Sequence, residues 1–204
     1  MKKNFFLILM FLLCAITGAN AQKKYSLYAV GFYNQENLFD TCHDEGKKDY
    51  DFLPNGSYHW DGLKYSHKLH NMARALADMG TDVLPNVGCA MIGLSEVENA
   101  KVLTDLVNQP ALKARNMQFV HIEGPDKRGI DCAMLYNPAL FKLESDTLYQ
   151  YVQELEKDSA FKTRGFLTIH GRLADEPVTV IVCHWPSRFS GPFYRESAAR
   201  QVKA

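Results

Sequence analysis

The sequence predicts a mixed α/β fold of packed layers, and three observations support that prediction. Of the 204 residues, 47% are hydrophobic, and 23 basic residues balance 23 acidic ones, which is typical of one globular domain with a core. Short β-prone runs recur along the chain. Segments with apolar residues at helical spacing lie among them. Helices layered against a sheet around a shared core are the expected outcome of such an order.

Six short apolar runs are expected to form strands, at residues 26–33, 90–97, 117–122, 130–136, 166–173 and 178–184. The first is interpreted as a buried strand that ends at the polar run 34–37. The last two enclose Asp175-Glu176-Pro177, which predicts an antiparallel hairpin.

Helices are expected at three places. Residues 63–79 carry Leu69, Ala73 and Leu76 at helical spacing, and Gly80 is placed to end the helix. A second helix is expected at 99–107, before Pro110, and a third helix-like stretch covers 193–203. Residues 41–61, rich in Asp, Gly, Pro and Lys, are expected to form a surface loop.

The N-terminus has the pattern of a secretory signal peptide. Lys2 and Lys3 precede an apolar run at 5–16, and small residues follow up to Ala21. We therefore expect residues 1–21 to be cleaved, and residues 22–204 to form the N-terminal portion of one domain that is secreted or periplasmic and not inserted in a membrane. An uncleaved anchor is the alternative, although a spanning helix needs about 20 apolar residues. Cleavage would leave a net charge of about −2, which does not favour a broad basic surface for binding nucleic acid.

The expected mature chain keeps four cysteines, Cys42, Cys89, Cys132 and Cys183. An exported protein permits disulfides, and four thiols allow three pairings. Three of the four lie in or beside apolar runs, so buried free thiols remain an equal alternative.

Polar residues that can do chemistry stand where the predicted strands end. They are Asn34, Glu36, Glu96, Asp131 and His184. Rigid strands fix such side chains while the edge of the sheet stays open to a ligand. Carboxylate and amide oxygens without thiolates suit Mg²⁺, Mn²⁺ or Ca²⁺ better than zinc. A solvated strand-end carboxylate is the ordinary alternative for Glu96.

His184 is followed by Trp185, Pro186, Ser187 and Arg188. A hydroxyl and a guanidinium close behind a histidine offer donors for phosphate oxygens, so this segment predicts an anion pocket. A lone strand-end histidine is more often structural. Arg128, near Asp131, is by itself more typical of a surface ion pair.

Four segments, taken in order, resemble the endonuclease/exonuclease/phosphatase superfamily of metal-dependent phosphoesterases, and most closely its secreted bacterial members. They are Phe32-Tyr33-Asn34-Gln35-Glu36-Asn37-Leu38-Phe39-Asp40, Ile92-Gly93-Leu94-Ser95-Glu96-Val97-Glu98-Asn99, Lys127-Arg128-Gly129-Ile130-Asp131-Cys132-Ala133 and His184-Trp185-Pro186-Ser187-Arg188. Four ordered motifs are a far more specific signal than any one of them.

The resemblance implies a four-layer α/β sandwich and the hydrolysis of a phosphate mono- or diester by metal-assisted water attack. It implies a Mg²⁺, Mn²⁺ or Ca²⁺ ion and a phosphate-ester substrate, nucleic acids among the candidates. No obligate protein partner is evident from the sequence. By the same resemblance the site residues have three roles. The catalytic residues are His184, Asp131 and Arg128, the phosphate-binding residues are Asn34, Ser187 and Arg188, and the metal ligands are Glu96 and Glu36.

Two departures from the family pattern modify this expectation. The family continues into a Gly-Asp-x-Asn segment and a late Asp-His pair, neither of which occurs in these residues, and Cys183 stands where the family usually has Asn. We therefore expect a C-terminally truncated sandwich whose second half is incomplete. An inactive secreted module that binds metal or phosphate without turnover is the alternative function. A zinc site at His67 and His70 is a weaker third hypothesis, because the His-Glu-x-x-His arrangement is missing.

Overall fold

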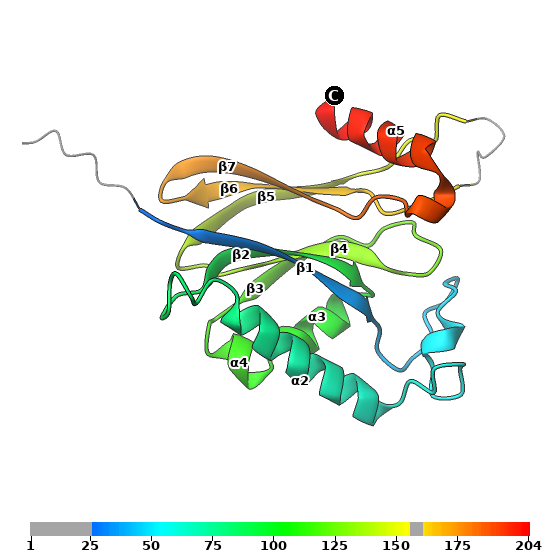
Figure 1. Ribbon diagram of the computed structural model, residues 1–204, viewed down its shortest axis with the longest axis horizontal. Helices are drawn as coiled ribbons and strands as arrows, with labels where there is room; N and C mark the ends of the chain where they lie inside the picture. Colours follow the sequence, from blue (N-terminus) through cyan, green and yellow to red (C-terminus); the bar gives the residue numbers. More distant parts are fainter. Residues whose placement is uncertain (1–25, 156–160) are drawn as a thin grey trace, which may run out of the picture.

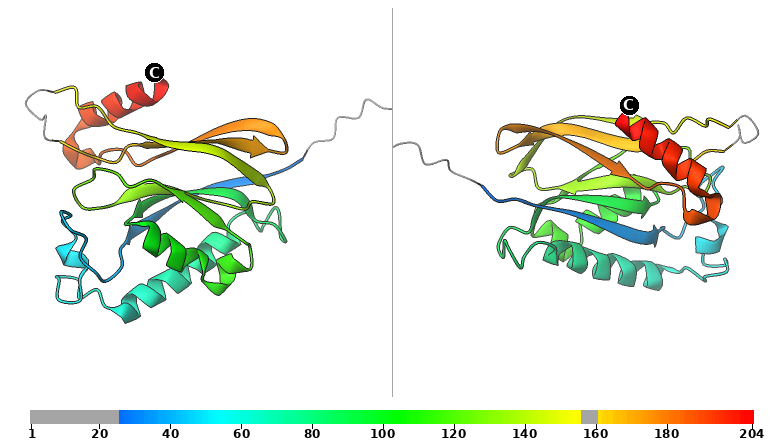
Figure 2. Two further views of the ribbon diagram at one scale, coloured as in Figure 1. Left: turned by 180° about the vertical axis from the view of Figure 1, so that it is seen from behind. Right: turned by 45° about the horizontal axis from the view of Figure 1, so that its top comes forward.

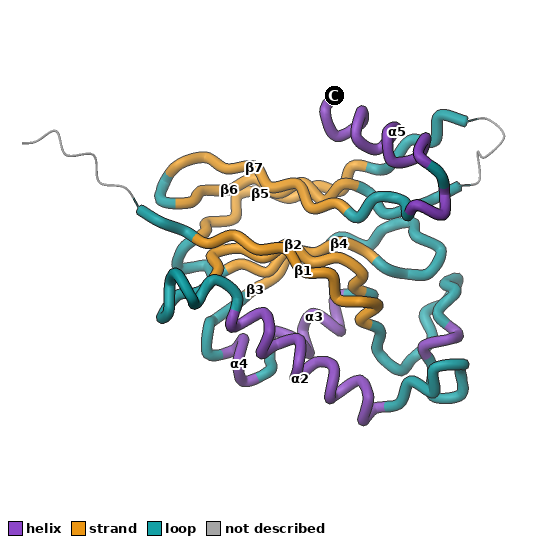
Figure 3. Tube along the Cα trace, in the orientation of Figure 1, coloured by secondary structure: helices purple, strands orange, loops and turns teal. Residues whose placement is uncertain are grey.

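Two β-sheets stacked face to face form the centre of the molecule (Figure 1). This computed structural model describes residues 26–155 and 161–204, so the predicted signal segment lies outside the described residues. Three helices cover the outer face of the first sheet, and a fourth lies over the second sheet (Figures 1 and 2). The order helix, sheet, sheet, helix confirms the predicted α/β sandwich, and Figure 3 shows the two sheets as adjacent layers.

The first sheet has four strands in the order β1-β2-β4-β3. Their bounds are Ala29–Leu38 for β1, Cys89–Val97 for β2, Gln118–His121 for β3 and Asp131–Tyr136 for β4. β1 runs parallel to β2, whereas β2 with β4 and β3 with β4 are antiparallel. The central strands β2 and β4 are almost wholly buried, as their continuous apolar sequences predict.

β1 differs from the buried strand expected at 26–33. It continues through the polar run to Leu38, and Val30 and Phe32 are 59% and 54% exposed. The reason is the position of β1 at the edge of the first sheet. Among the described residues, no other layer fully covers the face of β1 that carries Val30 and Phe32.

The second sheet is an antiparallel meander of β5 (Phe141–Tyr149), β6 (Phe166–Leu173) and β7 (Glu176–Cys183). The β6–β7 hairpin is confirmed, but its turn consists of Ala174 and Asp175, with φ of 52° and 64°. Two consecutive residues in the left-handed backbone conformation give a turn whose twist matches that of the two strands it joins. The sequence analysis missed β5, since most of its side chains are exposed and its apolar residues do not alternate cleanly.

The helices follow their sequence signals closely. They are α2 (Gly62–Asp78), α3 (Ala100–Val107), the short α4 (Pro110–Lys113), which was not predicted, and α5 (Pro192–Lys203). Two 3-10 turns precede helices, at Tyr50–Phe52 (η1) before α2 and at Arg188–Ser190 (η3) before α5. The Asp61 carboxylate caps α2, and the Asn99 amide oxygen caps α3. Among the described residues, no helix is both long and apolar enough to cross a membrane.

Apolar residues form two cores. One lies between helices α2 to α4 and the first sheet, and includes Leu76, Leu94 and Leu103. The other lies between the two sheets, and includes Met134 and Phe141. The two cores fix both sheets, and therefore the strand ends that carry the polar motifs.

All four cysteines of the expected mature chain are free thiols. Cys89 and Cys132 are buried, and burial raises the pKa of both thiols. The structure therefore favours the buried-thiol alternative over bridging.

Candidate active site

A cavity of about 360 Å³ opens where β2 and β7 end. Its lining brings together strand ends from both sheets and the loops beside them. The lining residues are Glu96, Asp126, Arg128, Phe161, Lys162, Thr163, Arg164, His184, Pro186, Ser187 and Ser190. The lining has three cationic side chains, those of Arg128, Lys162 and Arg164, against two carboxylates, so the cavity can attract an anion.

Glu96 lies in a bulge near the end of β2. The pairing of β2 with β4 shifts between Ser95 and Val97, and Glu96 itself has a left-handed φ of 60°. A bulge re-aims the side chain at the point where pairing is interrupted. One carboxylate oxygen, Oε2, accepts a hydrogen bond of 2.9 Å from the Asn37 backbone N–H. The other, Oε1, lies 3.6 Å from Nε2 of His184.

The end of β1, beside the bulge in β2, is also irregular. Its register against β2 shifts between Asn34 and Leu38, and Glu36 and Asn37 have φ of 50° and 62°. The Asn34 amide oxygen accepts a 2.8 Å hydrogen bond from the Glu36 backbone N–H. The Lys68 ammonium donates to the carbonyl oxygen of Glu36, and this contact ties the irregular segment to α2. Non-glycine residues in left-handed conformations persist only where the surroundings hold them, and they cluster at functional sites.

His184 follows the last residue of β7 and is 23% exposed. Burial, followed by the positive charge of Arg164, lowers the pKa of this imidazole, and the Glu96 carboxylate opposes the shift. His184 therefore favours the neutral form, in which one ring nitrogen can accept a proton. Its Nδ1 is buried and has no hydrogen-bond partner.

A buried ion pair forms one wall of the cavity. Nη1 of Arg164 donates to Oδ2 of Asp126 at 2.9 Å, and the two side chains are 9% and 7% exposed. Oδ1 of Asp126 accepts a hydrogen bond from the Arg128 backbone N–H. The pair fixes the loop before β4 against the segment that leads into β6.

A profile described as the Endonuclease/Exonuclease/phosphatase family matches residues 29–204. The chain belongs to this family. Two solved structures share the family fold with it. ANGEL2, described as a 2′,3′-cyclic phosphatase, is 14% identical with a TM-score of 0.50. D. rerio TDP2, humanized by 14 mutations, is 13% identical with a TM-score of 0.51.

The aligned region covers 74% of this chain and 39% of the ANGEL2 chain, and 85% of this chain and 53% of the TDP2 chain. The chain therefore spans about half or less of the length of these structures. Comparison with curated proteins found no match.

The cavity brings together Glu96, His184, Arg128 and Ser187 among the residues that the family resemblance proposed. Asn34 and Glu36 are exposed side chains on the irregular end of β1, beside Glu96 but not in the cavity lining. The remaining two proposed residues, Arg188 and Asp131, lie elsewhere.

Arg188 is exposed on η3 and is not among the cavity-lining residues. Asp131 is buried, and its Oδ2 accepts a 3.1 Å hydrogen bond from the Gly124 backbone N–H. Asp131 is therefore placed to position the loop before β4. The roles assigned to all eight residues remain predictions.

Three residues of the candidate site were not predicted from the sequence. Asp126 and Arg164 belong to none of the four motifs. Asn37 belongs to the first motif but had no assigned role, although its backbone N–H holds the Glu96 carboxylate. Only its position directly before the third motif could have drawn attention to Asp126, while the contact from Arg164 is long-range.

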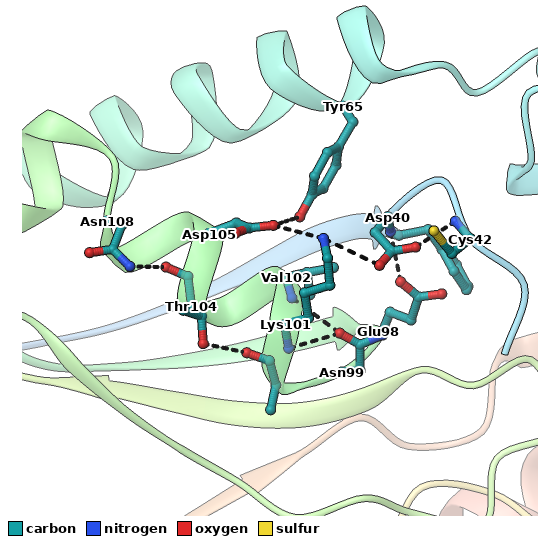
Figure 4. A network of polar contacts seen from close by, with 12 residues as sticks. Asp40, Cys42, Tyr65, Glu98, Asn99, Lys101, Val102, Thr104, Asp105 and Asn108 are labelled. Atoms are coloured by element: carbon teal, nitrogen blue, oxygen red, sulfur yellow. Dashed lines mark hydrogen bonds and ion pairs between the residues drawn. The ribbon is translucent and has the colours of Figure 1, made fainter.

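A second polar network supports the segments that carry Asn37 and Glu96. The Asp40 backbone N–H donates to Oε2 of Glu98 at 2.7 Å, and the Lys101 ammonium lies 3.5 Å from Asp40 and 3.0 Å from Asp105 (Figure 4). The Tyr65 hydroxyl donates to Asp105 and connects α2 to this network (Figure 4). These contacts tie the end of β1 to the start of α3.

Glu98 gives a prediction about stability and pH. Burial raises the pKa of its carboxyl from 4.5 to about 8, with Asp40, Asp44 and Asp49 adding to the shift and the hydrogen bond from Asp40 opposing it. The unfolded chain loses this proton near pH 4.5 while the folded chain keeps it, so the contribution of Glu98 to stability falls as pH rises from about 4.5 to 8. At pH 8, Glu98→Gln should therefore be more stable than the wild type by roughly 2–4 kcal/mol, and near pH 4.5 nearly equal to it.

Urea unfolding in the presence of a chelator, at several pH values, measures this difference. Glu45→Gln, at an exposed loop carboxylate, serves as the control. The difference in unfolding free energy between this variant and the wild type should not change with pH. A Glu98→Gln advantage that did not grow with pH would contradict the assignment.

The histidine pair proposed for zinc lies on α2, where both His67 and His70 are exposed. Neither belongs to a group of three close metal-ligand side chains among residues 26–155 and 161–204. The structure gives no support to that hypothesis.

Proposed function

We propose that this chain carries the active-site core of a metal-dependent phosphoesterase, which hydrolyses a phosphate mono- or diester by attack of water. The observation that carries the proposal is the approach of Glu96 to His184, 3.6 Å apart, at a cavity that Arg128 and Lys162 also line. Family membership gives independent support, since the endonuclease/exonuclease/phosphatase profile covers both residues.

The donor set fits a hard divalent cation. Glu96 keeps Oε1 free of hydrogen bonds from the backbone, and the buried Oδ1 of Asn37 has no hydrogen-bond partner. Carboxylate and amide oxygens are the ligands that Mg²⁺ and Mn²⁺ prefer. Glu96 would hold the ion, with Glu36 and Asn34 on the neighbouring strand end. When bound, such an ion neutralises developing charge on phosphoryl oxygens and lowers the pKa of water.

The chain's own residues would then bind and orient the ester. Arg128, Arg164 and Lys162 line the cavity and supply positive charge for the nonbridging oxygens. Ser187 adds a hydroxyl donor at the cavity wall. The neutral imidazole of His184 can hold or move a proton at Nε2, next to the Glu96 carboxylate.

We propose a class of substrates, phosphate esters, and not a single compound. ANGEL2 is described as a 2′,3′-cyclic phosphatase, and this supports a phosphate ester, with nucleic acids among the candidates. Export to the periplasm or the medium is proposed from residues 1–21 alone.

The test is a hydrolysis assay with bis(p-nitrophenyl) phosphate and p-nitrophenyl phosphate, with Mg²⁺, Mn²⁺ or a chelator present. We expect hydrolysis that requires the added ion and stops with the chelator. A folded chain that binds Mn²⁺ or phosphate without turnover of either ester would overturn the proposal in favour of the binding module without catalysis.

A further inference from the structure

A second group of metal-ligand side chains lies outside the cavity lining. It consists of His121 at the end of β3, Glu123 in the next loop and Asp131 at the start of β4. One ligand atom from each side chain lies within 4.8 Å of the others, and no other such group of three occurs among the residues that the structure describes. This spacing is compatible with a shared ion.

Sheet register explains why these residues meet. β3 and β4 are antiparallel, and His121 is paired with Ala133. Asp131 lies two residues from Ala133, and residues two apart on a strand face the same side of the sheet. The His121 ring and the Asp131 carboxylate are therefore placed side by side by the backbone, before any ion is considered.

The His121 ring gives an independent sign that the group can bind a ligand. Its side chain is 4% exposed, and Nε2 has no hydrogen-bond partner. Oδ2 of Asp131 lies 3.5 Å from this nitrogen, and that oxygen already accepts a hydrogen bond from Gly124. A buried polar atom without a partner is costly, and a bound cation would satisfy both the nitrogen and the carboxylate.

An ion that binds to Glu123 would have to displace the Lys47 ammonium. This ammonium lies 3.0 Å from Oε1 of Glu123 and donates to the carbonyl oxygen of Gly124 at 3.2 Å. The lysine side chain is 19% exposed and also packs against Gly129, whose φ is 77°. Its position shows that this part of the loop attracts positive charge, and it predicts that Lys47 limits cation affinity.

We propose that His121, Glu123 and Asp131 bind a Zn²⁺ ion, with water completing a tetrahedral site. The imidazole nitrogen favours zinc over Mg²⁺ or Ca²⁺, which take oxygen ligands. The ion joins β3 and β4 to the loop between them, and that loop carries Asp126 and Arg128 of the active-site cavity. None of these three residues lines the active-site cavity, so zinc binding can be measured separately from ester hydrolysis.

The test measures zinc binding by competition with a chromophoric chelator. The full chain, without a polyhistidine tag, carries Glu96→Gln and Cys42→Ser so that neither the proposed catalytic ligand nor the exposed thiol contributes. We expect one Zn²⁺ per chain, and roughly tenfold or more weaker binding after His121→Asn or Glu123→Gln. Lys47→Gln should bind more tightly, while His67→Asn, at an exposed histidine on α2, should leave the affinity unchanged.

Zinc affinity that is unaffected by both His121→Asn and Glu123→Gln would overturn the proposal. So would the absence of stoichiometric zinc in the folded Lys47→Gln chain. The Glu123 side chain is 53% exposed, so its replacement keeps the test decisive even where the buried His121 variant does not fold.

Discussion

Glu96→Gln is expected to lower metal-dependent phosphoester hydrolysis by roughly 100- to 1,000-fold, because the ion that this carboxylate holds supplies several kcal/mol of transition-state stabilisation. Glutamine keeps an oxygen that can accept the hydrogen bond from the Asn37 backbone N–H. The end of β1 should therefore stay in place while the negative charge is lost. Initial rates at saturating Mg²⁺ or Mn²⁺, together with Mn²⁺ affinity, measure the effect.

Glu176→Gln is the matched control for this substitution. Glu176 is an exposed residue at the start of β7, the strand that leads to His184, and is therefore at the end away from the cavity. Its replacement should leave both rate and Mn²⁺ affinity at the wild-type level. Equal rates for Glu96→Gln and the wild type would remove Glu96 from the mechanism.

Arg164→Met is expected to reduce the free energy of unfolding by about 3–5 kcal/mol, since it leaves the Asp126 carboxylate buried without its partner charge. Asp126 is 6% exposed, and its other oxygen is already held by the Arg128 backbone N–H. Urea unfolding of the wild type and of Arg164→Met measures this difference in the free energy of unfolding. Asp126→Asn combined with Arg164→Met should recover part of the loss, because the uncompensated charge is removed.

A surface pair on the second sheet provides the comparison. Nε of Arg172 lies 2.8 Å from Oε1 of Glu144, nearly the separation seen in the buried pair, but these side chains are 43% and 42% exposed. Arg172→Met should therefore cost only about 0–1 kcal/mol. If the two Arg→Met substitutions cost the same, burial is not what makes the Arg164 pair important.

The sequence predicts most of this fold because its signals are local. Helices α2 and α3 were predicted within one residue at each end, since Asp61 and Asn99 are capping residues and Gly80 follows α2. Strands β2 and β4 were predicted because strands buried on both faces are continuously apolar. β5 was missed because its exposed face carries charged residues that hide its periodicity.

The candidate site was predictable only in part, for a physical reason. Glu96 and His184 stand at strand ends within short motifs, so pattern alone selects them. Arg164 reaches Asp126 across 38 positions of sequence, and Asn37 acts through its backbone rather than its side chain. Such contacts depend on how the two sheets stack and on the irregular end of β1, which a single sequence does not encode locally.

The proposed metal site at Glu96 is tested most directly by a crystal structure of the chain soaked in Mn²⁺ and phosphate, with anomalous scattering used to locate the metal. We expect an anomalous peak about 2.0–2.6 Å from Oε1 of Glu96, with phosphate oxygens on the His184 side of the ion. Manganese bound only at His121, Glu123 and Asp131, or phosphate bound away from His184, would contradict this expectation.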